Sequence, residues 1–170
     1  MKVAETERLI LEKFTLNDAP FFLELVNSPN WIKYIGDRNT KTIKDAEIRI
    51  KNGHLQSYNN HGFGFYKVLL KSENHKPIGT CGLIKREELP EVDLGFAFLP
   101  EYEGKGFGFE ASEQVIKLAK NKHGLKALLA IVQAENKNSI KLLSKLGFVF
   151  KKIIIPFNDG KELELFTKKL

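Results

Sequence analysis

Residues Glu91–Ala111 read EVDLGFAFLPEYEGKGFGFEA, and this stretch decides the fold that the rest of the chain is expected to take. Val92–Phe98 has the alternation of a strand, three glycines follow at alternate positions (Gly104, Gly106 and Gly108), and apolar residues at helical spacing come next. The first N–H groups of a helix lack partners and carry partial positive charge, and glycine lets a ligand approach the backbone closely. The stretch therefore predicts a phosphate-binding turn at a helix N-terminus.

The two faces of the expected strand differ in chemistry, because successive side chains point to opposite faces. One face is apolar and carries Val92, Leu94, Phe96 and Phe98. The other face combines carboxylates with small residues and carries Glu91, Asp93, Gly95 and Ala97. We expect the first face to belong to the core and the second to place carboxylates beside empty volume.

Composition predicts one globular domain over residues 1–170, because 42% of the residues are hydrophobic and 28% are charged. The single cysteine, Cys81, cannot form an internal disulfide, and no segment has the apolar length of a signal-peptide core or a bilayer span. We therefore expect a cytoplasmic protein with no membrane role. The net charge of +6 comes from lysines spread along the chain, so no direct nucleic-acid role is expected.

Strands and helices are expected on both sides of the glycine turn. Before the turn, the sequence predicts strands at Arg8–Phe14, Phe63–Lys71 and Pro77–Ile84, helices at Thr15–Ser28 and from Thr42 to about Ser57, and loops at Asn30–Asn39 and Asn59–Gly62. After the turn it predicts a helix ending near Gly124, a buried strand at Leu125–Val132, a helix at Ser139–Leu146, and a hairpin of Phe148–Ile155 with Glu162–Thr167.

These elements predict a mixed α/β (α+β) fold. Short connections favour antiparallel pairing of the first strands, whereas the strand–helix–strand unit favours a parallel pair of Glu91–Phe98 with Leu125–Val132. We expect a central mixed, mostly antiparallel sheet of about seven strands, flanked by about four helices.

Two other phosphate-binding motifs fit the glycine turn less well. A nucleotide-hydrolase loop has Lys followed by Ser or Thr directly after its last glycine, whereas Gly108 is followed by Phe109-Glu110, so that motif is excluded. The dinucleotide fingerprint G-x-G-x-x-A is satisfied by residues 106–111, with Glu135 after the next strand. The chain after Glu135 is too short for the remaining elements of such a domain, and a proline and two glutamates separate strand from glycines.

The chain resembles the GNAT superfamily of N-acetyltransferases over nearly its whole length. The resemblance rests on LGFAFLPEYEGKGFGFEA, residues 94–111, followed some thirty residues later by ENKNSIKLLSKLGF, Glu135–Phe148. The segments TERLILEKFTLNDA and NSPNWIKYIG are similar to the branch that contains the Rim-type ribosomal-protein alanine N-acetyltransferases. The resemblance implies a GNAT-like fold whose fourth and fifth strands, Glu91–Phe98 and Leu125–Val132, splay apart. It also implies acetyl-CoA as co-substrate and no metal.

The same resemblance implies a set of cofactor-binding residues. Main-chain groups of Phe96, Ala97 and Phe98 are expected to bind the pantetheine arm, and Asn136 is expected to contact it. The amides of the glycine turn are expected to bind the pyrophosphate, with Lys105 as a supporting charge; they belong to Gly104, Lys105, Gly106, Phe107, Gly108 and Phe109.

Two positions depart from the family pattern. Glu103 stands where the family often has Gln or Arg, so the glycine turn must rely more on its backbone. Leu143 stands where many members have a tyrosine that protonates the leaving thiolate, so another proton donor is needed.

Acetyl transfer to an amine needs a base and a fixed donor for the developing oxyanion. The resemblance implies a backbone N–H near Phe98 as that donor. For the base we expect Asp93 first and Glu91 second, unless both lie at the solvated start of the strand. For the acid, Ser139 acting through water is one candidate, although it is equally placed to cap a helix, and Tyr102 is another. We expect Cys81 to be a core thiol and the histidines to be surface or cap residues.

The sequence thus predicts an acyltransferase that moves the acetyl group of acetyl-CoA directly to a primary amine. The acceptor is either a protein N-terminus, such as that of a ribosomal protein, or a small-molecule amine, and the protein is a monomer or a homodimer. The alternative is an acyl-CoA-binding sensor or interaction module of the same fold without turnover.

Overall fold

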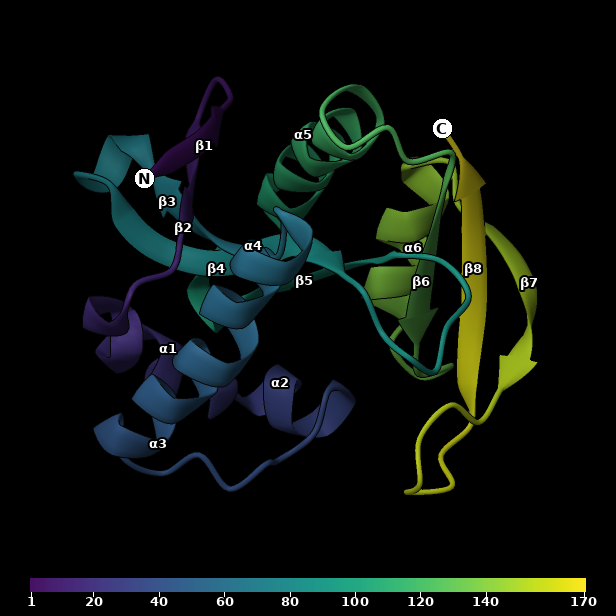
Figure 1. Ribbon diagram of the computed structural model, residues 1–170, viewed down its shortest axis with the longest axis horizontal. Helices are drawn as coiled ribbons and strands as arrows, with labels where there is room; N and C mark the ends of the chain where they lie inside the picture. Colours follow the sequence, from purple (N-terminus) through teal and green to yellow (C-terminus); the bar gives the residue numbers. More distant parts are fainter.

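The computed structural model describes residues 1–170 and contains one sheet of eight strands in the order β1-β2-β3-β4-β5-β6-β8-β7 (Figure 1). The strands are β1 Lys2–Glu5, β2 Leu9–Lys13, β3 Phe65–Leu70, β4 Lys76–Ile84, β5 Asp93–Phe98, β6 Ala127–Val132, β7 Val149–Ile154 and β8 Leu163–Lys169. Every neighbouring pair is antiparallel except β5 with β6. The expected mixed, mostly antiparallel sheet is confirmed.

Helices cover both faces of the sheet (Figure 1). They are α1 Ala19–Val26, α2 Pro29–Tyr34, α3 Ile43–Arg49, α4 Gln56–His61, α5 Phe107–Asn121 and α6 Lys137–Lys145. Helix α5 packs on β2, β4 and β5, while α1, α2, α3 and α4 form a layer on the opposite side, and α6 packs on α5 and β6. None of these helices is long and apolar enough to cross a membrane.

Strands β5 and β6 pair at a single position. Asp93 lies opposite Leu129, and the Leu129 N–H donates to the Val92 C=O at 3.0 Å. Beyond this point β6 continues along β8, and β5 loses its neighbour on that side. The expected splay between these two strands is confirmed, and it opens a wedge in the middle of the sheet.

The structure has more elements than expected at three places. Strand β1 was not predicted, because its four residues are too few to show a clear alternation, and it makes the sheet eight-stranded instead of about seven-stranded. The expected loop at Asn30–Asn39 begins as helix α2, since Pro29 ends one helix and is also well suited to the first position of the next. The helix from Thr42 continues past Ser57 through the expected loop to His61.

A π-helical turn, Ile50–Leu55, joins α3 to α4 and packs the partly buried His54 against aromatic rings of the core. The His54 ring lies 4.4 Å from the ring of Phe14 and 5.0 Å from that of Phe22, and its Nδ1 atom is buried without a hydrogen-bond partner. The expectation of a surface or cap residue is therefore wrong for His54. Helical spacing from Ala46 and Ile50 does point to this side of the helix, but a histidine is usually polar and exposed, which favoured the surface assignment. Burial, helped by the charge of Arg49, lowers the pKa of His54 to about 4.

This buried imidazole predicts a loss of stability in mild acid. Between pH 6.5 and about 4 the unfolded chain binds a proton at His54 while the folded chain does not, so the free energy of unfolding falls as the pH falls. The contribution of His54 to this loss of unfolding free energy is absent above pH 6.5 and reaches about 3 kcal/mol below a pH of about 4. We expect His54→Met to remove this dependence, as measured by urea unfolding at several pH values between about 4 and about 8.

A matched control is His61→Gln, which removes an exposed histidine from the same helical segment. It should keep the pH dependence of the parent protein. An unchanged pH dependence in His54→Met would contradict the prediction.

Candidate functional site

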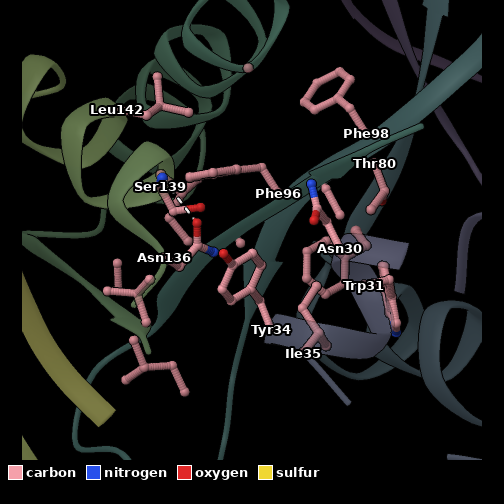
Figure 2. Close-up of a pocket in the computed structure, with 18 of the residues that line it drawn as sticks. Asn30, Trp31, Tyr34, Ile35, Thr80, Phe96, Phe98, Asn136, Ser139 and Leu142 are labelled. Carbon is pink, nitrogen blue, oxygen red and sulfur yellow. Dashed lines mark hydrogen bonds between the residues drawn. The ribbon is translucent and has the colours of Figure 1, made fainter. Parts of the chain in front are cut away.

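A cavity of about 1720 Å³ opens where β5 and β6 separate. Its walls come from β5, the glycine turn, the end of β6, helices α2 and α6, and the π turn. Figure 2 shows Tyr34 of α2 beside Asn136 at the start of α6, with Ser139 and Phe96 of β5 nearby and Trp31 on the far side of the opening. The cavity thus connects the predicted phosphate-binding turn with the helical layer on the other side of the sheet.

The main-chain groups of Phe96 and Phe98 face this opening. Neighbouring residues of a strand direct their N–H and C=O groups to opposite edges. The Val92 C=O bonds to β6 and the Leu99 N–H donates to β4, so Phe96 and Phe98 face the β6 side. Because β6 has diverged there, this edge is unpaired and can accept another extended chain. The main-chain groups of Ala97 face β4 instead, and Ala97 contributes its side chain to the cavity wall.

The glycine turn presents unpaired amides. No N–H group of residues 104–109 donates to an acceptor within the protein, and the first bond of this segment runs from the Glu110 N–H to the Gly106 C=O at 3.1 Å. Gly104 has φ of 71° and Gly106, the N-cap of α5, has φ of 83°, which side chains rarely tolerate. Gly108 serves close packing, since a Cβ there would lie 3.0 Å from Leu142 Cδ2. The turn has the chemistry of an anion site.

A clamp formed by Arg8 and Glu110 holds this turn against the N-terminal strands. The Glu110 carboxylate accepts hydrogen bonds from the Arg8 N–H, 2.9 Å, Arg8 Nε, 2.7 Å, and Thr6 Oγ1, 2.6 Å. Arg8 also donates to the Lys105 C=O at 3.2 Å and lies over the Phe107 ring at 4.4 Å. Partial burial acts to raise the pKa of Glu110, but the bonds from Thr6 and Arg8 outweigh it and hold the pKa below its usual value.

Asp93 lies on the face of β5 that meets the helical layer. It shares this face with Gly95, where a Cβ would be 2.7 Å from the Phe65 ring, and that ring packs near His54 of the π turn. The volume expected to be empty beside Gly95 is therefore partly filled by Phe65. The Asp93 carboxylate is 1% exposed and accepts a hydrogen bond from Arg86 Nε at 2.9 Å.

Burial raises the pKa of Asp93 above its usual range, against the opposing charge of Arg86. The expectation that both carboxylates lie at the solvated start of the strand is thus wrong for Asp93. It is correct for Glu91, which is exposed and does not line the cavity. Of the two candidate bases, only Asp93 reaches the cavity.

At the start of α6, Asn136 and Ser139 both line the cavity (Figure 2). Asn136 is the N-cap, and its Oδ1 accepts from the Ser139 N–H at 3.3 Å. Ser139 is therefore not the cap, and its hydroxyl makes no hydrogen bond within the protein. Leu143, one turn later, is buried in the core and supplies no proton donor.

The comparison with known families decides the identity of this fold. The family of the acetyltransferase (GNAT) domain matches residues 8–149. The chain belongs to the GNAT acetyltransferase family. It is 28% identical over 162 residues to the uncharacterized N-acetyltransferase p20 of Bacillus licheniformis, covering 95% of this chain and 90% of that protein.

Rim-type proteins are more distant homologues and structural neighbours of this GNAT acetyltransferase. The [ribosomal protein uS5]-alanine N-acetyltransferase of Escherichia coli (strain K12) is 26% identical over 98 residues, which is 56% of this chain and 50% of that protein. The solved structure of RimL, a ribosomal L7/L12 α-N-protein acetyltransferase in complex with coenzyme A, superposes with a TM-score of 0.79 at 11% identity and covers 100% of this chain and 98% of that one.

The cavity of this GNAT domain gathers most of the residues singled out in the sequence. They are Asp93, Phe96, Ala97, Phe98, Gly104, Gly106, Gly108, Phe109, Asn136 and Ser139. Lys105 and Phe107 do not line it: Phe107 is buried under Arg8, and Lys105 is exposed with its Nζ over the Tyr102 ring at 5.8 Å. Tyr102 also lines the cavity, but its hydroxyl donates to Glu73 at 2.6 Å and is therefore already engaged.

Several contacts that build the site were missed in the sequence. Arg8 and Glu110 are 102 positions apart, and no short motif joins them. Arg86 lies in the connection before β5, which looked like a plain turn. Gln133 Nε2 donates to the Tyr34 C=O at 3.0 Å and ties the end of β6 to α2. Only the tertiary fold brings these pairs together.

The positive φ of Gly106 predicts a selective loss of cofactor binding. Gly106→Val forces a β-branched residue into a strained conformation at the N-cap of α5, which costs about 1–3 kcal/mol unless the turn rearranges. We expect the variant to fold and to bind acetyl-CoA at least about 10-fold more weakly, as measured by titration calorimetry.

The same helix offers a matched control at its other end. Gly124 has φ of 64° and open space around its Cβ position, and it does not line the cavity. Gly124→Val should carry a similar strain yet leave the acetyl-CoA affinity unchanged. Equal affinities in the two variants would argue against phosphate binding at the turn.

Proposed function

We propose that this GNAT enzyme transfers the acetyl group of acetyl-CoA directly to a primary amine, with the coenzyme held between β5 and β6. One observation carries the proposal: the unpaired edge of β5 at Phe96 and Phe98 and the unpaired amides of residues 104–109 border the same cavity. An extended amide-containing arm that ends in a diphosphate needs both features.

The pantetheine arm is assigned to the β5 edge and the pyrophosphate to the glycine turn. The arm's amides can add to the edge of β5 as another strand would, using the main-chain groups of Phe96 and Phe98. The amides of residues 104–109 supply donors for the phosphate oxygens, and Lys105 adds a charge at the rim. The Asn136 amide nitrogen, free of protein partners, is available to the arm on the α6 side.

The reaction needs a neutral amine, which attacks the thioester carbon. Asp93 is proposed to accept the amine proton, because its carboxylate lies in the cavity on the acceptor side and its raised pKa makes it a stronger base. The Phe98 N–H points into the opening and is the proposed donor to the carbonyl oxygen as negative charge develops there. When the C–S bond breaks, the thiolate takes a proton, for which the free Ser139 hydroxyl is proposed to act through water.

The acceptor is proposed to be a protein N-terminus or a small-molecule amine. The first choice is supported by the distant homology to alanine N-acetyltransferases that modify ribosomal proteins. The second is supported by the helical wall, which lines the acceptor side of the cavity with aromatic and polar side chains. We also propose a cytoplasmic location, because the one cysteine is buried and unpaired.

The acetyl-CoA assignment is tested by thermal unfolding with and without ligand. Acetyl-CoA at about 100 times its Kd adds about 2.7 kcal/mol, which raises the Tm by roughly 5 to 10 °C. NADH or ATP should not reproduce the shift. Release of thiol from acetyl-CoA, followed with a panel of amines and N-terminal peptides, separates turnover from the alternative of a binding module: binding without release from any acceptor would favour the module.

Asp93 provides the sharpest test of the chemistry. Asp93→Asn keeps the size and the hydrogen bond to Arg86 but removes the base, so kcat should fall by about 10²- to 10⁴-fold while the KM for acetyl-CoA changes little. Steady-state thiol release measures both constants. Glu91→Gln, a matched change two residues earlier on an exposed side chain, should leave kcat unchanged. A larger loss in Glu91→Gln than in Asp93→Asn would move the base to Glu91.

A further inference from the structure

The helical wall of the cavity carries two arginines and no carboxylate. Between residues 22 and 57 the lining residues are Phe22, Ser28, Asn30, Trp31, Tyr34, Ile35, Arg38, Arg49, Asn52, Gly53, His54 and Ser57. The carboxylates that line the cavity all belong to other elements: Glu7, Asp93, Glu103, Glu110, Glu113 and Asp159. The burial of His54 keeps its imidazole neutral above mildly acidic pH, so the fixed charge of this wall is positive.

Arg49 is half-buried and has donors to spare. One guanidinium nitrogen donates to Thr40 Oγ1 at 3.0 Å, and the guanidinium carbon lies 5.2 Å from the centre of the Phe22 ring. It forms no ion pair and no other side-chain hydrogen bond in the protein, although a guanidinium has five N–H donors. These two contacts hold the group in place, Arg49 lines the cavity, and its remaining donors have no partner in the protein.

Arg38 adds a second uncompensated charge beside Arg49. It forms no ion pair, and it is near enough that its charge, after burial, helps to lower the pKa of Arg49. Nearby carboxylates are engaged elsewhere, since Asp37 pairs with Lys41 and Asp18 pairs with Lys67. Two like charges on one wall without a counterion repel each other, and a ligand anion between them relieves that repulsion.

We propose that the acceptor amine of this enzyme carries an anionic group, a carboxylate or a phosphate, which Arg49 and Arg38 bind on the helical wall of the cavity. The inference rests on the proposed amine acetylation and narrows its substrate class. Arginine suits the role because its planar fork matches the oxygens of either anion.

The two ends of such an acceptor meet opposite charges in the cavity. Asp93 lies on the face of β5 that meets the helical layer and is already paired with Arg86, so an acceptor whose amine lies near Asp93 can extend its anionic end toward the wall that holds Arg49, which has no such partner. A polyamine would place its second cation against the arginines. It would be repelled by them and would also lack the anionic group that they bind, so it should be excluded. A matched amine without the anion loses two charge-assisted contacts.

Trp31 supplies a binding signal that does not depend on turnover. It is the only tryptophan, it lines the cavity, and its ring lies 6.4 Å from the Phe22 ring that Arg49 covers. Titration of Trp31 fluorescence in the presence of coenzyme A therefore reports occupation of the helical wall. The probes are O-phosphoethanolamine and β-alanine, which carry phosphate and carboxylate, with ethanolamine and putrescine as neutral and cationic counterparts.

We expect the two anionic amines to bind at least about 10-fold more tightly than ethanolamine, and putrescine to bind most weakly. The better of the two anionic probes identifies the anion as phosphate or carboxylate. Arg49→Gln should weaken binding of the anionic probes by roughly 10- to 100-fold without changing ethanolamine binding. Arg38→Gln should also weaken binding of the anionic probes. Because Arg38 is exposed and lies away from the core, this variant can still be tested if Arg49→Gln folds poorly.

Lys51→Gln is the matched control, because it removes an exposed cation from the same helical segment outside the cavity. It should leave all four affinities unchanged. The proposal is overturned if ethanolamine or putrescine binds as tightly as the anionic amines, or if the arginine variants weaken all probes equally. Thiol release with the same four amines and with N-terminal peptides addresses the proposed function separately: absence of release from every acceptor would count against acetylation, while selective binding of the anionic amines would still support the anion site.

Discussion

The single contact between β5 and β6 is the constraint on which the rest of the site depends. One parallel pairing, Asp93 opposite Leu129, joins two halves of a sheet that otherwise have their own antiparallel partners. Because the strands meet once and then diverge, the β5 edge is left with unpaired main-chain groups in the interior of the molecule, where such groups are normally satisfied. The cavity follows from this topology and not from any one side chain. Asp93 sits at the point of divergence, so the proposed base and the proposed cofactor edge are set by the same residue pair.

The local parts of this architecture were readable in the sequence. The alternation of Val92–Phe98, the glycines after it and the apolar run of Leu125–Val132 each have a short-range cause, so the two strands and the glycine turn could be placed without coordinates. The splay between the strands was implied only by the resemblance to the GNAT superfamily. The glycine turn could be predicted in detail because positive φ values and unpaired amides follow from the residue type and from the start of a helix.

The parts that the sequence hid are those that depend on contacts between distant residues. Arg8 and Glu110 carry no signal of their partnership, because both look like ordinary surface charges until the fold brings β2 next to α5. His54 was misjudged because its polar residue type outweighed its helical spacing from Ile50, and helix α2 was missed because a proline that stops one helix also starts the next. Arg49 and Arg38 look like two of many cations in a basic chain, and only the tertiary structure shows that they line the cavity from the helical layer without forming an ion pair.

The hydrogen bond between Asn30 and Glu103, 2.7 Å long, has a consequence for how two ligands would influence each other. It joins the first turn of α2, which borders the acceptor wall, to the residue that precedes the glycine turn. An anion arriving at the turn and a molecule settling against α2 would thus act on opposite ends of one bond. By thermodynamic linkage, the factor by which the first ligand changes the affinity for the second equals the factor by which the second changes the affinity for the first. The coupling between the two substrate sites then passes in part through this one carboxamide–carboxylate hydrogen bond.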